Sequence, residues 1–179
     1  LKHWNAGPGK RVAILGMGGL GHMGVKFAHA LGAHVTVISH SNNKREDALR
    51  LGADAFINSS ESGALDGAVA SFDLILNTVS ADLDINAYLK LLRWDGALVI
   101  LGLPGQPLTV HAGVLMGKRR SLAASGIGGL KETQEMLDFC GEHNIVSEIE
   151  VITPDYINEA WDRVVASDVK YRFVIDING

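Results

Sequence analysis

Residues 11–27 read RVAILGMGGLGHMGVKF, and this stretch decides how the chain folds. Its first five residues are mostly apolar and branched, which predicts a short buried strand over 11–15. Glycines follow at positions 16, 18 and 21, and a helical periodicity begins near position 19. In the helix that we expect over 19–31, one face is shared by Leu20, Met23, Gly24, Phe27, Ala28 and Leu31. We expect this face to pack on the strand.

The glycines have the spacing G-x-G-x-x-G between a strand and a helix. Gly16 permits the tight turn, Gly18 leaves room for a pyrophosphate, and Gly21 lets the helix pack close to the strand. Gly19 and Leu20 lie in the same turn, where the first helical N–H groups and the positive end of the helix face an anion. A glycine-rich turn without a ligand is the alternative. The strand before it and the helix after it favour a dinucleotide.

The following residues, up to about position 128, continue the alternation of strand and helix. Strands are expected at 34–38, 55–57, 72–78, 97–101 and 121–125, and helices at 44–51 and 82–92. The strands lack polar alternation, which predicts a parallel sheet that is covered on both faces. The fold class is therefore α/β, a Rossmann doubly wound parallel sheet.

The alternation of strand and helix is interrupted at residues 126–129, which include three glycines. A helix over 131–140, a strand over 149–152, a helix over 156–166 and a strand over 171–177 are expected after it. We therefore divide the chain into a dinucleotide-binding domain, residues 1–128, and a separate C-terminal segment, residues 129–179.

Composition limits the classes of function. Hydrophobic residues make up 47% of the 179 residues and charged residues 20%, a balance typical of a well-filled core. The net charge of −4 argues against a general binder of nucleic acid or of anionic membrane. Cys140 is the one cysteine, so no intrachain disulfide or multi-cysteine metal site can form. No signal peptide or membrane-spanning run is recognised, so we expect a cytoplasmic protein, and the first residue, Leu1, indicates a fragment.

The end of the second predicted strand indicates which dinucleotide would bind. An NAD site usually has an acidic residue there, about 20 residues after the glycines, for the ribose hydroxyls. Here Ser39, His40, Ser41 and Lys44 follow the strand, and no acid precedes Glu46. Serine and lysine donate to a 2′-phosphate, whereas a carboxylate would repel it. A solvated turn that caps the next helix is the alternative, and both can hold. The residues predict NADP(H).

Four stretches carry a family resemblance: 16–23 (GMGGLGHM), 32–37 (GAHVTV), 131–137 (KETQEML) and 168–176 (DVKYRFVID). They resemble the medium-chain zinc-dependent alcohol dehydrogenases, most closely the cinnamyl-alcohol-dehydrogenase-like, NADP-dependent branch. The resemblance implies a cofactor domain placed between two pieces of a catalytic domain. Residues 129–179 would then be the C-terminal segment of an incomplete catalytic domain. The N-terminal piece, which carries the zinc ligands in the family, would be missing.

The resemblance also assigns cofactor contacts. Gly18, Gly19 and Leu20 would face the pyrophosphate. Ser39, Ser41 and Lys44 would hold the 2′-phosphate, and His40 stands where the family often has a small polar residue. The remaining contacts would lie at the ends of later strands: Thr78, Val79, Gly102, Leu103, Ser125 and Ile127.

The resemblance implies that the intact parent enzyme transfers hydride between NADP(H) and a primary alcohol or aldehyde, with zinc polarising the substrate oxygen. A zinc-free quinone or enoyl reductase of the same superfamily and a stand-alone dinucleotide-binding module are the alternatives. The seven histidines show no H-E-x-x-H spacing, and Cys140 is expected on the packed face of a helix. We expect no catalytic residue and no zinc site in this chain, which alone would be inactive. A homodimer paired through residues 121–125 is also expected.

Overall fold

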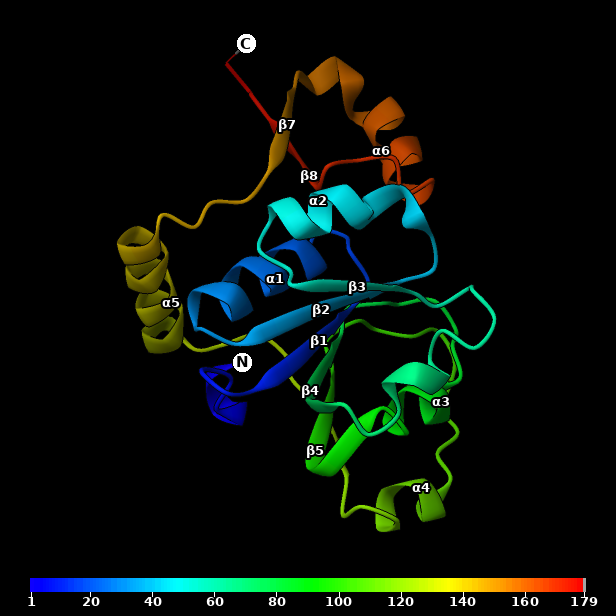
Figure 1. Cartoon of the computed structure of the whole chain (residues 1–179). Coiled ribbons are helices and arrows are strands. Elements are labelled where there is room, and N and C mark those ends of the chain that lie inside the picture. The colour runs from blue at the N-terminus through cyan, green and yellow to red at the C-terminus, as the bar shows by residue number, and fades with distance from the viewer. Residues whose placement is uncertain (179) are drawn as a thin grey trace.

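A six-stranded parallel sheet organises the structure, a computed structural model that describes residues 1–178 (Figure 1). The strand order is β3-β2-β1-β4-β5-β6, and every neighbouring pair is parallel. This is the order of a Rossmann fold, so the predicted α/β class is confirmed. The strands are β1 (Arg11–Leu15), β2 (His34–Ser39), β3 (Ala55–Asn58), β4 (Phe72–Asn77), β5 (Leu92–Ile100) and β6 (Ser121–Ala124).

Helices cover both faces of this sheet. The helices are α1 (Gly21–Ala30), α2 (Arg45–Arg50), α3 (Ile85–Leu89), α4 (Ala112–Met116), α5 (Leu130–His143) and α6 (Ile157–Val165). Side chains of α1 and α2 join the buried cluster on one face, and those of α3 and α4 join the cluster on the other. Within residues 1–178, no helix has the length and apolar character that crossing a membrane requires.

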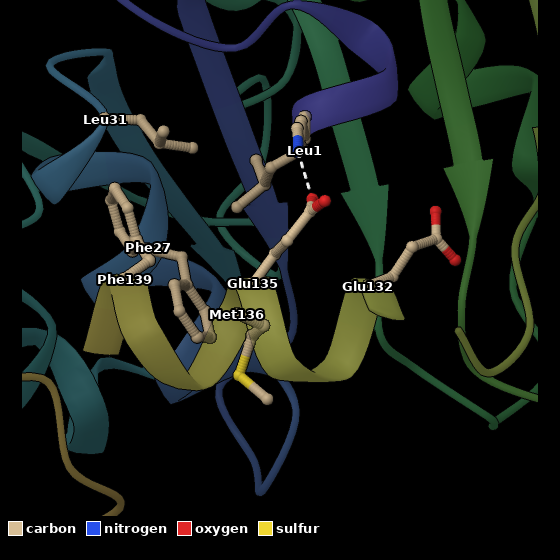
Figure 2. Close-up of a pocket in the computed structure, with 8 residues that line it drawn as sticks. Leu1, Phe27, Leu31, Glu132, Glu135, Met136 and Phe139 are labelled. Carbon is tan, nitrogen blue, oxygen red and sulfur yellow. Dashed lines mark hydrogen bonds and ion pairs between the residues drawn. The ribbon is translucent and has the colours of Figure 1, made fainter. Parts of the chain in front are cut away.

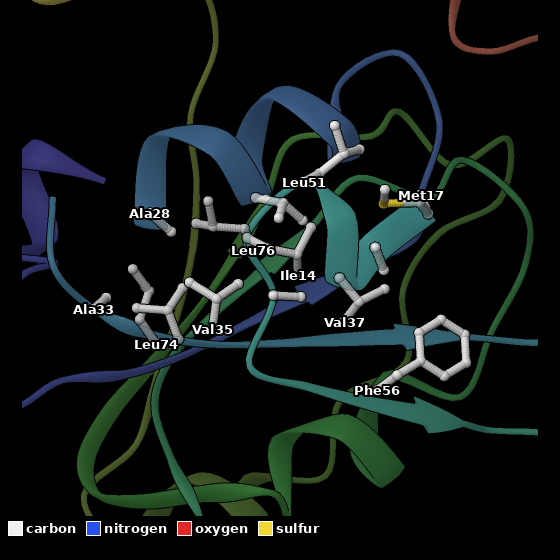
Figure 3. Close-up of a cluster of buried hydrophobic side chains, with 14 of the residues drawn as sticks. Ile14, Met17, Ala28, Ala33, Val35, Val37, Leu51, Phe56, Leu74 and Leu76 are labelled. Atoms are coloured by element: carbon white, nitrogen blue, oxygen red, sulfur yellow. The ribbon is translucent and has the colours of Figure 1, made fainter. Parts of the chain in front are cut away.

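The core consists of two clusters, one on each face of the sheet. Val12 and Ile14 point to the face under α1, whereas Ala13 and Leu15 point to the opposite face, because successive strand residues alternate. Figure 3 shows the first cluster, where Ile14 lies among side chains of β2, β4, α1 and α2. Burial of each large aliphatic side chain stabilises the fold by about 1.5–3 kcal/mol.

The packed face of α1 differs from the predicted one. Its buried residues are Gly21, His22, Val25 and Ala28, whereas Leu20 is 50% exposed. A Cβ atom on Gly24 would lie only 3.3 Å from Cδ1 of Ile14, so this helix lies very close to the sheet. Small side chains therefore face the strands, and the larger ones predicted for that position lie to the side.

The helix predicted over 82–92 is shorter in the structure. The carboxylate of Asp84 accepts a hydrogen bond from the backbone N–H of Asn86, 3.0 Å away, and α3 starts at Ile85. Strand β5 already begins at Leu92, which pairs with Phe72 of β4. Pairing with β4 therefore takes Leu92, which helical periodicity alone assigned to the helix. Helix α4 was not predicted.

The last part of the chain forms a small parallel sheet of its own, from β7 (Ile149–Ile152) and β8 (Arg172–Ile175). Among the described residues, these strands pair with each other and with no strand of the large sheet. Their apolar side chains remain partly exposed, including Val151 at 63%. Helix α5 has no buried residue, so the predicted packed face around Cys140 is wrong for this chain. The domain boundary at residue 128 stays a prediction.

Candidate dinucleotide site

The glycine-rich turn after β1 is built so tightly that two of its positions exclude a side chain. Gly16 has φ 92°, and a Cβ atom there would lie 2.7 Å from Cγ2 of Val79 and 2.9 Å from Oγ1 of Thr78. A Cβ atom on Gly21 would lie 2.2 Å from the carbonyl oxygen of Gly16. Both glycines therefore serve the close passage from strand to helix, as predicted from their spacing.

Gly18 has a different environment from its neighbours in the turn. Among the described residues, no heavy atom lies within 4 Å of the position that its Cβ atom would take. The open space lies beside the first turn of α1, a ten-residue helix. A helix N-terminus favours an anionic group, and an added side chain on Gly18 would fill the space that such a group needs. The turn therefore fits a pyrophosphate.

The carboxyl ends of β1, β4 and β5 meet beside this turn. The hydroxyl of Thr78 donates to the carbonyl oxygen of Leu15 at 2.9 Å and so links β4 to β1. A Cβ atom on Gly102 would lie 2.3 Å from the carbonyl oxygen of Val79, so the segment after β5 lies directly against the end of β4. The structure thus brings Gly16, Thr78, Val79 and Gly102 together.

The three remaining predicted residues, Leu103, Ser125 and Ile127, follow β5 and β6 and are more exposed than Thr78 and Val79. Leu103 is 86% exposed, and its backbone N–H donates to the hydroxyl of Ser80 at 3.2 Å. Ser125 and Ile127 follow β6, and both are exposed. The backbone N–H of Ser125 donates to the carbonyl oxygen of Ile100 at 3.0 Å. These side chains border the edge without contacting the glycine-rich turn.

The segment after β2 supplies polar groups and one cation. Ser39 is buried at the strand end, Ser41 is half-buried, and His40 is exposed. The ammonium of Lys44 donates to the carbonyl oxygen of Met17 at 3.1 Å, so this cation lies against the glycine-rich turn. Burial lowers the pKa of Lys44 below its usual value. The position suits an anion that lies beside the turn.

Sequence reasoning missed the residues by which the C-terminal segment reaches this turn. A cavity of about 420 Å³ is lined by Gly18, Gly19, Lys44, Val164, Ser167, Val169, Tyr171, Arg172 and Phe173. The guanidinium of Arg172 donates to the carbonyl oxygen of Gly19 at 3.0 Å. Two cationic side chains, Lys44 and Arg172, therefore border one cavity at the turn. The stretch 168–176 carries part of the family resemblance, but its contact with residue 19 cannot be inferred from the sequence.

The comparison with known proteins now decides the family. Residues 19–142 match the family described as zinc-binding dehydrogenase. The chain belongs to this family. The resemblance to zinc-dependent alcohol dehydrogenases that the sequence indicated is thereby confirmed.

Proteins similar to this chain include bacterial and plant dehydrogenases. NADP-dependent alcohol dehydrogenase C 1 of Mycolicibacterium smegmatis is 64% identical over 176 residues, which are 98% of this chain and 50% of that protein. The structure of a cinnamyl alcohol dehydrogenase from Sorghum bicolor superposes with a TM-score of 0.96 at 45% identity, over 99% of this chain and 51% of that one. CAD from Helicobacter pylori, solved in complex with NADP(H), gives a TM-score of 0.89 at 36% identity, over 98% of this chain and 50% of that one. The chain spans about half the length of the curated relatives it matches.

Zinc, which the family name implies, does not fit the residues present in this chain. A zinc site needs three or four ligands from cysteine, histidine or carboxylate side chains. Within residues 1–178, no three such side chains lie close enough to hold a metal ion. Cys140 lies on α5 with its sulfur 3.7 Å from that of Met136.

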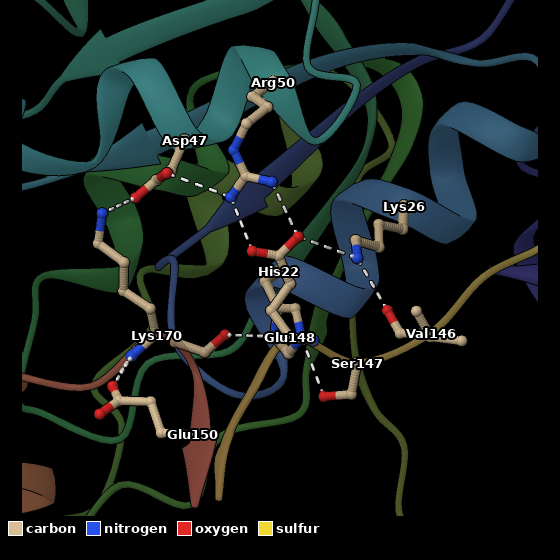
Figure 4. Close-up of polar contacts among 10 residues, drawn as sticks. His22, Lys26, Asp47, Arg50, Val146, Ser147, Glu148, Glu150 and Lys170 are labelled. Atoms are coloured by element: carbon tan, nitrogen blue, oxygen red, sulfur yellow. Dashed lines mark hydrogen bonds and ion pairs between the residues drawn. The ribbon is translucent and has the colours of Figure 1, made fainter.

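An ionic network joins the C-terminal segment to α1 and α2 (Figure 4). Arg50 donates to both carboxylate oxygens of Glu148, at 2.9 and 2.7 Å, and Lys26 approaches the same carboxylate at 3.4 Å. The hydrogen bonds from Arg50, followed by the charges of Arg50 and Lys26, lower the pKa of Glu148 to about 2. Lys170 pairs with Asp47 of α2 at 2.6 Å. The segment that borders the candidate site is thus tied to the large sheet's helices by charge.

A second cavity lies away from the glycine-rich turn, between the N-terminal residues, α1 and α5 (Figure 2). It measures about 480 Å³, and Phe27, Met136 and Phe139 give it an apolar wall. Its charged side chains include Glu135, which accepts from Lys2 at 2.5 Å, and Glu132. This cavity lies away from the glycine-rich turn and the strand ends, so it is no candidate for the dinucleotide.

Proposed function

We propose that this chain is the NADP(H)-binding portion of a zinc-dependent alcohol dehydrogenase, with residues 1–128 as cofactor domain and 129–179 as a segment of the catalytic domain. The observation that carries the proposal is the open glycine-rich turn at Gly18 with the ammonium of Lys44 beside it. The mycobacterial relatives, which are named as NADP-dependent alcohol dehydrogenases, support the same cofactor and reaction.

Each group of residues would hold a different part of the cofactor. The turn from Gly16 to Gly21, with Gly18, Gly19 and Leu20 nearest the ligand, would hold the pyrophosphate through backbone N–H groups. Ser39, Ser41 and Lys44 would donate to the 2′-phosphate, with His40 at the rim. The nicotinamide half would lie along the strand ends that carry Thr78, Val79, Gly102, Leu103, Ser125 and Ile127.

When bound, NADP(H) supplies the hydride that an aldehyde accepts, and its oxidised form takes one from a primary alcohol. The residues of this chain would contribute binding and orientation. Val79 and Gly102 lie in direct contact at the strand ends, so they form a rigid wall against which a flat ring can pack. Polarisation of the substrate oxygen is assigned to the other half of the parent, because no metal-ligand cluster is found among residues 1–178.

Calorimetric titration with NADPH and NADH tests this proposal. Two or three charge-assisted hydrogen bonds to the 2′-phosphate could supply about 1.5–3 kcal/mol each before desolvation and ordering costs. A net preference for NADPH of about 10- to 1,000-fold follows, at about 1.4 kcal/mol per tenfold. Lys44→Met should remove most of this preference, and Lys90→Met, on the α3 side of the sheet, is the matched control. Equal affinities for the two cofactors would contradict the proposal.

A second assay concerns the chain without the rest of its parent. We expect nucleotide binding with no stoichiometric zinc and no NADP-linked oxidation of benzyl or cinnamyl alcohol. Without zinc, nothing among residues 1–178 would stabilise the alkoxide from which hydride departs. Elemental analysis and an absorbance assay for NADPH measure both properties. Stoichiometric zinc together with turnover would show that a metal site has been overlooked.

A further inference from the structure

His22 is a buried polar residue that joins two segments distant in the sequence. It lies in the first turn of α1 and has no exposed surface. Its Nδ1 atom lies 3.1 Å from the carbonyl oxygen of Gly18 in the glycine-rich turn. Its Nε2 atom lies 3.1 Å from the hydroxyl of Ser147 and 3.2 Å from the backbone N of Glu148. One ring thus connects the turn to the entrance of β7 (Figure 4).

The partners of the ring define its protonation state. The carbonyl oxygen of Gly18 can only accept, so Nδ1 carries the hydrogen. The backbone N–H of Glu148 can only donate, so Nε2 must be the acceptor. The arrangement therefore requires the neutral imidazole, with each nitrogen committed to a different segment.

Tyr171, the residue before β8, packs against the same imidazole ring. Its ring stacks on that of His22, with centroids 4.7 Å apart and planes at 16°. The backbone N–H of Tyr171 donates to the carbonyl oxygen of Glu148 at 3.1 Å, and its own carbonyl oxygen lies 3.3 Å from the Cβ position of Gly19. Tyr171 is 3% exposed. The two contact points of the C-terminal segment, at 147–148 and at 171–172, therefore meet on one imidazole.

The charges around the ring also favour its neutral form. Burial, followed by the positive charges of Lys26 on α1 and Arg172 on β8, lowers the pKa of His22, although its hydrogen bond to the turn opposes this. The Glu148 carboxylate is engaged by Arg50, and burial raises the pKa of Tyr171 well above its usual value. Asp47 of α2, the other carboxylate beside Tyr171, is paired with Lys170 and Arg50. The carboxylates near the ring are thus engaged by cations, which favours the neutral imidazole.

We propose that His22 is a positioning residue for the cofactor: it holds the glycine-rich turn and the C-terminal segment in one arrangement, so that pyrophosphate binding and docking of this segment favour each other. The proposal rests on the proposed function, since it takes NADP(H) as the ligand of the turn. A ligand that holds the N–H groups of the glycine-rich turn also fixes the peptide of Gly18, whose carbonyl oxygen accepts from the imidazole. The imidazole in turn accepts from the backbone N–H of Glu148. By reciprocity, loss of the contact at either end weakens the other.

Two conservative variants separate the ends of this connection. His22→Asn places an amide nitrogen near the position of Nδ1 and keeps the bond to Gly18, whereas His22→Gln places an amide oxygen near Nε2 and keeps the bond from Glu148. Both should weaken NADPH binding about tenfold, within the range of measured couplings between sites. His29→Gln, an exposed change on the same helix, is the matched control and should bind as the wild type does.

Hydrogen exchange of the full 179-residue chain distinguishes a positioning role from a merely structural one. A merely structural role of His22 would not make the exchange rates at Glu148 and Tyr171 depend on NADPH. NADPH should slow exchange at Glu148 and Tyr171 in the wild type and in His29→Gln, and should leave both rates unchanged in the two His22 variants. The ratio of wild-type to His22→Gln affinity should also fall once the pH lies below the lowered pKa of His22, because a protonated Nε2 cannot accept from Glu148. This ratio cancels the titration of the ligand's own 2′-phosphate.

The results separate a failure of the positioning role of His22 from a failure of the proposed function. Wild-type binding without slowed exchange at Glu148 and Tyr171 would overturn the positioning role and leave the proposed function standing. Folded His22 variants that bind NADPH with wild-type affinity would do the same. A wild-type chain that does not bind NADPH would overturn the proposed function and, with it, the role of His22. The exchange measurement on the wild-type chain tests the positioning role even if a His22 variant does not fold.

Discussion

Replacement of Gly18 by alanine should separate binding from stability, because the two effects have opposite signs. No heavy atom of the described chain lies within 4 Å of the new Cβ atom, and Gly18 does not have a positive φ. The methyl group meets no steric resistance in the free protein. Loss of glycine's freedom in the unfolded chain should then stabilise the fold by about 0.4–1 kcal/mol. For a chain of this size, the melting temperature should rise by about 1–4 °C.

The same methyl group occupies the space that the pyrophosphate needs. An overpacked contact costs about 1–3 kcal/mol, which corresponds to about a 5- to 150-fold loss of NADPH affinity. Thermal unfolding and calorimetric titration of the same sample measure the two effects. Gly113→Ala in α4, which also has open space around its Cβ position, should raise stability without a change in affinity. Unchanged NADPH affinity in a folded Gly18→Ala variant would refute the placement of the pyrophosphate.

Three further predictions follow from other contacts. Gly21→Ala should destabilise the fold by about 3 kcal/mol or more, seen as a lower urea midpoint, because its Cβ atom would lie 2.2 Å from a backbone oxygen. Glu148→Gln should cost about 1–2 kcal/mol at pH 7. Since the folded pKa of Glu148, about 2, lies below the ordinary 4.5, this contribution is lost as the pH falls from 4.5 towards 2, where wild-type and variant stabilities should converge. Leu122→Lys in the edge strand β6 should convert the expected homodimer to a monomer in light scattering, whereas a wild-type monomer would contradict that pairing.

The local part of this fold could be predicted from the sequence. The strand at 11–15, the glycine spacing and the apolar strands that follow are short-range patterns, and the parallel sheet follows from their alternation with helices. The predicted face of α1 was only partly right: Gly24 and Ala28 lie on the packed side, whereas Leu20 does not. Periodicity assigns the largest apolar residues to the core. In this helix the close approach at Gly24 selects small residues instead.

The contacts of the C-terminal segment could not be predicted, because they join residues more than 100 positions apart. His22 contacts Ser147 and Glu148, and Arg172 contacts Gly19. His22 follows the third motif glycine in the sequence, but its spacing to the other histidines bears only on a metal site, not on a buried contact. Its position one residue after the turn could have indicated a buried hydrogen-bonding role.

The most direct test of the central claim is a map of NADPH-induced amide shifts in the isotope-labelled chain. The account predicts the largest shifts at Gly18 and Gly19 in the turn, and at Val79 and Gly102 at the adjoining strand ends. Smaller shifts should follow at Glu148 and Tyr171 through His22. Shifts confined to the cavity between α1 and α5, around Met136, or no shifts at millimolar NADPH, would contradict it.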